Sequence, residues 1–186
     1  MTDEGVFPKV DGDILYASEV NDNFSMSQHQ QIILSAASGG IVFDGLDGTS
    51  FDQFKFSFLC GTNATGSSSI GLKINEQTSY SFSWGENGTY HAEGNSSPLI
   101  FGYVGNGSPN LVSFYEGTIN NKGSSAGGGF SLISLGTDQQ NNKVYVAGGR
   151  VLETGAGSVT RIDLTCSTGS FLSGTTATIW GIRENI

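Results

Sequence analysis

The chain has 186 residues, a length that fits one domain better than two. Charged residues make up 13% of it and Gly accounts for 28 positions, which disfavours helices, while the 12 Phe, 6 Tyr and 2 Trp exclude a disordered Gly/Ser tract. The formal net charge is −9 and the basic residues are scattered, so we expect neither nucleic acid as a partner nor insertion into a membrane.

Residues 1–36 differ in composition from the rest and form the first predicted region. Ser18 is suited to cap a helix, and Tyr16, Val20 and Phe24 recur at a spacing of four, which predicts one apolar stripe. An isolated helix of about ten residues is marginal in water, so it must pack on its own domain or on another chain. We therefore expect residues 1–36 to be an extended N-terminal arm with one short helix, and His29 to lie near the end of that helix. The side chains expected to make its docking or oligomer contacts are Phe7, Ile14, Leu15, Tyr16, Val20 and Phe24.

From about residue 31 onward the period of the sequence is two, as in strands with one buried face. Phe54, Phe56 and Phe58 alternate with polar residues, and residues 79–84 alternate aromatic with Ser. Clusters of Gly, Asn and Ser separate short runs of this kind, which indicates a sandwich or barrel. We expect residues 37–186 to be all-β, and the long loops favour a jelly-roll β-sandwich. The further strands are expected at 70–74, 99–103, 111–115, 130–135, 143–147, 162–166 and 176–182.

No grouping of residues in the sequence predicts catalysis, a metal or a cofactor. The two His residues are isolated, with His91 expected in a polar loop, and residues 123–127 match the G-x-S-x-G pattern without the helix that a nucleophile elbow needs. Asp44, Asp47 and Asp52 could offer oxygens to a cation, although Asp-Gly pairs are ordinary turn chemistry. We expect Cys60 and Cys166 to be free thiols, and a disulfide between them is left open.

Aromatic residues leave room for a sugar-binding alternative. Tyr90, and Trp84 at a strand end, could stack on sugar rings. The alternation of Tyr80, Phe82 and Trp84 instead points all three side chains into the core.

Two stretches of the sequence resemble a known class of proteins. Residues 12–24, Gly-Asp-Ile-Leu-Tyr-Ala-Ser-Glu-Val-Asn-Asp-Asn-Phe, resemble a segment that recurs in tail and fibre proteins of tailed phages and their archaeal relatives. The stretches 43–48, 72–75, 79–81, 162–164 and 179–182 resemble jelly-roll domains of phage structural proteins. Such domains occur on tail tips, fibres and capsid decorations, commonly as trimers. Their frequent Asn-Gly-Asp is replaced here by Asn-Glu-Gln at residues 75–77.

The resemblance implies a non-enzymatic structural protein of a virion, assembled in the host cytoplasm and displayed on the tail or head surface. Its partners would be other virion proteins and further copies of the chain, most simply as a homotrimer, and it could contact a glycan or protein on the host surface. The acidic N-terminus, which lacks the features of a secretory signal, agrees with synthesis in the cytoplasm. Apolar residues at consecutive positions in 99–101 and 180–182 also favour self-association, because one side chain in each run must point away from the core.

Loops at one end of the sandwich are the expected receptor-facing region, because loops vary while strands keep the fold. Their candidate residues are Tyr90, His91, Asn106, Asn110 and Asn120. The alternative function is a carbohydrate-binding β-sandwich module of a cell-envelope or host protein.

Overall fold

Alternation of buried and exposed side chains shapes the strands of this protein. The computed structural model describes residues 26–96, 98–104, 113–121, 131–138, 143–151 and 157–183, and in these ranges every regular element is a β-strand. In β3 (Gln53–Cys60), Phe54, Phe56 and Phe58 are buried while Lys55 is exposed. The all-β expectation is thus confirmed.

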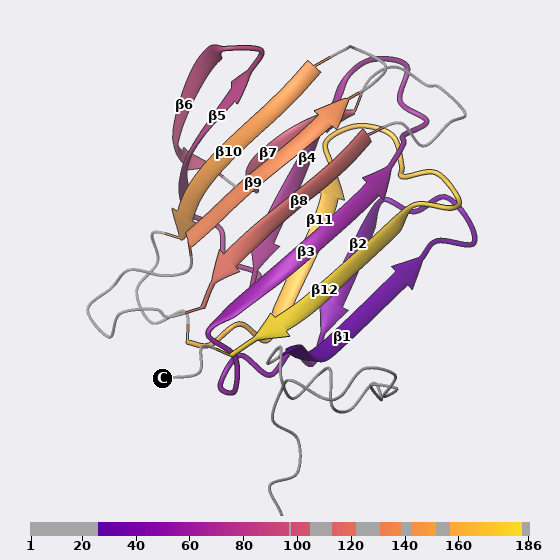
Figure 1. The fold of residues 1–186 in the computed structure, drawn as a ribbon. Helices are drawn as coiled ribbons and strands as arrows, with labels where there is room; N and C mark the ends of the chain where they lie inside the picture. Colours follow the sequence, from indigo (N-terminus) through magenta and orange to yellow (C-terminus); the bar gives the residue numbers. More distant parts are fainter. Residues whose placement is uncertain are drawn as a thin grey trace, which may run out of the picture.

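The strands form two antiparallel sheets that pack face to face as a β-sandwich (Figure 1). The larger sheet has eight strands, in the order β1 (Met26–Ile33), β12 (Thr176–Ile182), β3, β8 (Ser113–Asn120), β9 (Ser131–Asp138), β10 (Lys143–Val151), β5 (Tyr80–Glu86) and β6 (Thr89–Ser96). The smaller sheet has four strands, in the order β2 (Gly40–Asp44), β11 (Arg161–Cys166), β4 (Ser68–Ile74) and β7 (Leu99–Val104). Two pairs of consecutive strands, β5–β6 and β9–β10, lie side by side in the larger sheet and extend it beyond β8.

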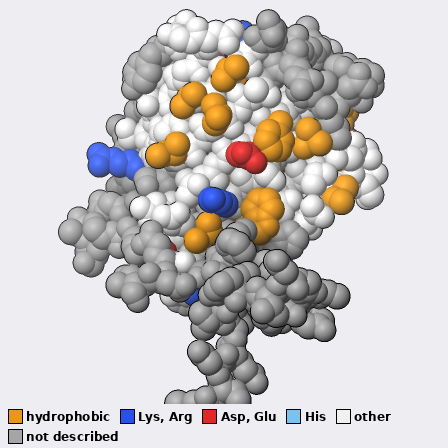
Figure 2. Space-filling model, viewed as in Figure 1, with side chains coloured by type: hydrophobic (Ala, Val, Ile, Leu, Met, Phe, Trp, Pro, Cys, Tyr) orange, Lys and Arg blue, Asp and Glu red, His pale blue; other side chains and the backbone are white. Residues whose placement is uncertain are grey.

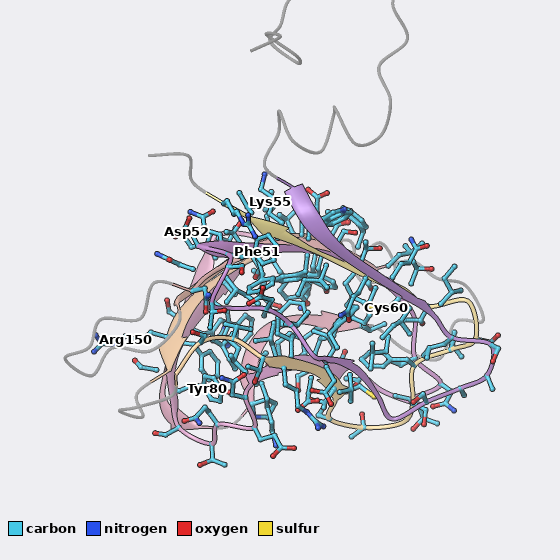
Figure 3. All side chains as sticks on the ribbon, turned by 90° about the horizontal axis from the view of Figure 1, so that it is seen from below. Phe51, Asp52, Lys55, Cys60, Tyr80 and Arg150 are labelled. Atoms are coloured by element: carbon cyan, nitrogen blue, oxygen red, sulfur yellow. The ribbon has the colours of Figure 1, made fainter. Side chains whose placement is uncertain are left out.

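Aromatic side chains from both sheets fill the space between the layers, as the view from below shows (Figure 3). Phe56 of β3 meets Phe101 of β7 edge to face at 5.6 Å, and Phe101 meets Tyr115 of β8 at 5.5 Å. The Tyr115 hydroxyl donates a hydrogen bond to the Tyr103 carbonyl at 2.5 Å and accepts one from its amide at 3.1 Å. Ring contacts and hydrogen bonds in one buried aromatic cluster therefore join β8 of the larger sheet to β7 of the smaller sheet.

The N-terminal region differs from its sequence-based prediction. Residues 26–33 form β1, which pairs antiparallel with β12 at the edge of the larger sheet, so the sheet begins inside the segment expected to be the arm. His29 accordingly lies in a strand, opposite Trp180, and not at a helix end. The short helix and the six docking residues from Phe7 to Phe24 lie outside the described residues. Among the residues that are described, no helix is long and apolar enough to cross a membrane.

Candidate functional site

Exposed apolar side chains lie on the outer face of the larger sheet across four neighbouring strands. We call the exposed hydrophobic side chains of β3, β8, β9 and β10 the outer patch; Ile133 is 71% exposed and Leu135 is 59% exposed. Figure 2 shows hydrophobic side chains over this face with acidic and basic ones between them. The members of the outer patch are Leu59, Phe114, Ile133, Leu135, Val144 and Val146.

Strand register brings these side chains together. Leu59 lies opposite Phe114 across β3 and β8, and Leu135 lies between Glu116 of β8 and Val146 of β10. Their inward neighbours along the chain, such as Tyr115 and Tyr145, are fully buried. β10 is thus apolar on both faces, because Val144 and Val146 are exposed while Tyr145 and Ala147 are buried, whereas β3 and β8 also carry polar outward residues such as Lys55 and Glu116.

A hollow of about 460 Å³ lies beside the outer patch. It is lined by Trp180 of β12, Lys55 of β3, Glu116 and Thr118 of β8 and Ile133 of β9, among others. Trp180, Lys55, Thr118 and Ile133 follow one another in a row across four strands. Trp180 thus points away from the core, as the apolar run at 180–182 predicted, and the exposed Lys55 and Glu116 supply the charges of this hollow.

A second aromatic group lies at the other end of the larger sheet. The rings of Trp84 and His91 stack with centroids 4.0 Å apart, and Tyr103 of β7 lies 4.9 Å from Trp84. All three residues are half-buried, and His91 Nε2 is buried without a hydrogen-bond partner among the described residues. Trp84 packs on the core together with the buried Tyr80 and Phe82, which confirms the inward direction predicted from their alternation.

The expected receptor-facing loops are placed differently by the structure. Tyr90 and His91 belong to strand β6 and not to a loop, because the turn before them is only two residues long, with Asn87 and Gly88 both at positive φ. Such Asn-Gly turns are typical of tight hairpins. Asn120 is the last residue of β8. Asn106 and Asn110 lie outside the described residues.

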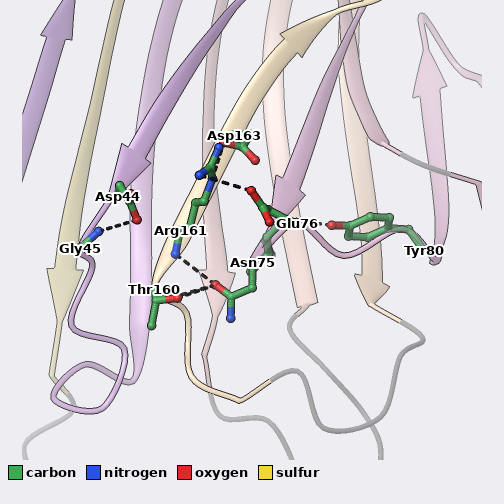
Figure 4. A network of polar contacts seen from close by, with 9 residues as sticks. Asp44, Gly45, Asn75, Glu76, Tyr80, Thr160, Arg161 and Asp163 are labelled. Atoms are coloured by element: carbon green, nitrogen blue, oxygen red, sulfur yellow. Dashed lines mark hydrogen bonds and ion pairs between the residues drawn. The ribbon is translucent and has the colours of Figure 1, made fainter.

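Polar residues that were open candidates for a ligand are engaged in turns. Hydrogen bonds from Ser50 and Thr49 hold the pKa of Asp47 below its usual value, and Asp44 accepts a bond from the Gly45 amide. In the part of the chain that the structure describes, no three His, Cys, Asp or Glu side chains are grouped to hold a metal ion. Another polar side chain stabilises a turn at the end of β4, where the Asn75 side-chain oxygen accepts hydrogen bonds from the amides of Thr160 and Arg161 (Figure 4).

The Arg161 side chain joins this network to β11. Its guanidinium bonds Asp163 at 2.9 Å and pairs with Glu76 at 3.3 Å, and the bond to Asp163 raises the pKa of Arg161. Asn75 and Glu76 form the tight turn after β4, both at positive φ.

Asn121 is a polar centre that the sequence analysis did not single out. Its buried amide donates to the carbonyls of Gly48 and Phe51 and accepts from the Val159 amide at 2.8 Å. The residue binds two loops that are far apart in sequence, and nothing in its local sequence indicates those partners.

Cys60 and Cys166 are not joined in a disulfide, in agreement with the expected thiols. Cys60 is fully buried in the core, and Cys166 of β11 is half-buried, so that desolvation raises the pKa of its thiol.

Comparison with known proteins gives no family. No family model matches the chain, and no curated protein matches it either. Among solved structures, arcelin-5, a lectin-like defense protein from Phaseolus vulgaris, aligns with 84% of this chain and 100% of its own, at 8% identity and a TM-score of 0.20. A likeness this weak carries no argument about function.

Proposed function

We propose that the chain is a jelly roll with two inserted hairpins, used as a non-enzymatic structural protein of a tailed-virus particle. The observation that supports the fold is the strand order. Without the hairpins β5–β6 and β9–β10, eight strands remain, and we number them one to eight in chain order: β1, β2, β3, β4, β7, β8, β11 and β12. In these numbers the larger sheet has the order one-eight-three-six and the smaller sheet has the order two-seven-four-five. Winding two Greek keys into a double sheet produces this order, and such jelly rolls serve in capsids and in lectins.

The virion role rests on that strand order together with the resemblance of residues 12–24 to tail and fibre proteins. Asp44 and Asp47, two of the possible cation ligands, accept hydrogen bonds within their turns, which agrees with a structural role. The genes beside the coding sequence test the proposal. Capsid, portal or tail genes are expected there, and sugar-uptake or glycosidase genes would overturn it.

The N-terminal residues are proposed to anchor the protein, on the head or on the tail, by docking onto other virion proteins. Because β1 belongs to the larger sheet, the deletion that tests this proposal removes residues 1–25 and leaves Met26–Ile33 whole. The shortened chain should fold and remain soluble but be missing from purified particles. Incorporation at the normal copy number would show that the anchor lies elsewhere.

Further copies of the chain are the second proposed partner. The resemblance ranks a trimer first, and the apolar outer patch supports self-association of some order. Sedimentation of the purified chain at micromolar concentration measures the oligomeric state, and a strict monomer would contradict self-association.

Contact with a glycan or protein on the host surface is the remaining proposal for the virion protein. Purified protein that competes with virus adsorption would support this role, and no competition at saturating protein would contradict it.

The carbohydrate-binding module stays as the second candidate because Trp84, His91 and Tyr103 form a half-buried aromatic group beside the edge strand β6. Binding to a glycan array that Trp84→Ala abolishes and Trp180→Ala preserves would favour this candidate. The Trp180 variant is the matched control, because it removes a half-buried indole from the opposite face of the same sheet.

A further inference from the structure

We propose that the outer patch is the contact between two copies of this chain, whose larger sheets pack face to face about a twofold axis. The inference rests on the proposed self-association of the chain and is independent of the virion role. The twofold contact describes a dimer, and it also occurs in a hexamer built from two trimers.

The size and chemistry of the face suit such a contact. Strands spaced about 4.8 Å apart and rising about 3.4 Å per residue give the four strands of the outer patch a face of roughly 500 Å², which the adjoining β12 and β1 extend to roughly 700 Å². A stable interface needs about 800 Å² from each partner, so this face is close to the required size. At its centre Ile133 and Leu135 are 71% and 59% exposed, and burying such side chains against a matching surface drives association.

The charges on the face favour a second copy over an unrelated partner. The chain carries a net charge of −9, so two copies repel each other unless they meet where charge is balanced. Lys55 on β3 and Glu116 on β8 are both exposed beside the outer patch and lie in neighbouring rows of the sheet. A twofold axis in the interface plane, passing between these side chains, places Lys55 opposite the partner's Glu116 and Glu116 opposite the partner's Lys55. The Lys55–Glu116 pair is therefore complementary to its own symmetry mate; a further charge on this face, the exposed Arg150 of β10, lies in the row beyond Lys55.

Other ligand classes fit the outer patch less well. The Ile, Leu and Val side chains that dominate it offer no hydrogen bonds to a sugar, which a carbohydrate site needs. A partner of different sequence would not require both signs of charge at adjacent positions.

The first test uses two exposed valines, one in each sheet. Val146 of the outer patch is 54% exposed, and Val42 on β2 of the smaller sheet is 43% exposed. Val146→Asp should raise the dissociation constant at least roughly tenfold in sedimentation equilibrium, because it brings a carboxylate into the apolar contact. Val42→Asp is the control and should leave the constant unchanged. Equal effects of the two variants would overturn the assignment of the surface while leaving self-association intact.

The second test exchanges charges between copies. Lys55→Glu alone places two acids opposite each other at both symmetric contacts, and Glu116→Lys alone places two bases there, so each variant should associate at least roughly tenfold more weakly than the natural chain. An equimolar mixture of the two variants should recover association, since each mixed pair regains both ion pairs. No contact within a single chain can produce that recovery.

The outcomes distinguish the twofold contact from the proposed self-association on which it rests. A monomeric natural chain would overturn self-association and this inference together. A natural trimer without dimers or hexamers, or a mixture that fails to recover, would overturn the twofold contact alone. Dimers or hexamers that respond to Val146→Asp and recover in the mixture would support it.

Discussion

Single buried polar side chains hold the loops of this sandwich, and Asn121 is the clearest case. Its amide forms three hydrogen bonds that tie the segment before β3 to the segment before β11. We expect Asn121→Ala to lower the free energy of unfolding by about 3 kcal/mol, because two carbonyls and one amide would lose their partner in a buried place. Urea denaturation measures the change. Ser67→Ala, at an exposed loop position, is the control and should change it by less than about 0.5 kcal/mol.

Backbone conformation at Glu76 makes a second prediction at the residue scale. Glu76 has a φ of 59°, a region that Gly occupies without the steric cost paid by other residues. Glu76→Gly should therefore be more stable than Glu76→Ala by about 1 kcal/mol, since both variants lose the exposed ion pair with Arg161 and only Gly relieves the strain. Thermal unfolding of the two variants makes the comparison, and equal midpoints would show that the turn is not strained.

Glycines in the strands leave room for large aromatic rings on neighbouring strands, as Gly136 of β9 does for Tyr115 of β8. A Cβ atom on Gly136 would overlap the Tyr115 ring, which is itself held by two hydrogen bonds to Tyr103. Gly136→Ala should cost about 3 kcal/mol of stability, because neither the ring nor the strand can move away. Gly39→Ala is the matched control, since nothing lies within 4 Å of its added methyl group. Comparable losses from both variants would contradict the close fit of β9 on Tyr115.

At the scale of elements, the sequence predicted nine of the twelve strands and missed β1, β2 and β6. Residues 54–58 and 162–166 alternate clearly and form β3 and β11. The Gln-rich β1 and the polar β6 are the outermost described strands of the larger sheet and contain few apolar residues, so alternation in them is weak. The Asn-Gly pair before β6 was a usable hairpin signal. Pairing of β1 with β12 joins the two ends of the described chain, and no local pattern encodes it.

The candidate site was less predictable than the fold for a similar reason. In residues 131–135 and 143–147, apolar residues occur at positions that point to either side of a strand, a pattern that indicates two apolar faces. Only the register of β8, β9 and β10 shows that the outward-pointing residues of these strands form one patch. The bonds of Asn121 depend on loops that meet only in the folded chain.

As a whole molecule, the sandwich has one core shared by both sheets, so the sheets should unfold together. Cys60 in that core should react with a thiol reagent only on global unfolding, and Asn121→Ala should speed its labelling by the factor by which it raises the unfolding constant. Mass spectrometry of labelled peptides follows both thiols.

Cys166, half-buried, should react in the native state, slowly near neutral pH. Its rate should keep rising beyond pH 9, because burial raises the pKa of its thiol above the ordinary value of 9.0 and the thiolate is the reactive form. Native labelling of Cys60 as fast as that of Cys166 would contradict a single cooperative core.

In this sandwich, the residues that keep the molecule folded differ from those that it presents to its surroundings. Four of the six outer-patch residues lie on β9 and β10 and are exposed, while Tyr145 and Ala147 of β10 are buried in the core. Substitutions at these outward positions leave the packing between the sheets untouched, so they can weaken or strengthen self-association without lowering the stability of the fold. Homologues are therefore expected to retain Tyr115, Gly136 and Asn121 whatever their oligomeric state, and to keep the outer patch apolar only where they associate in the same way.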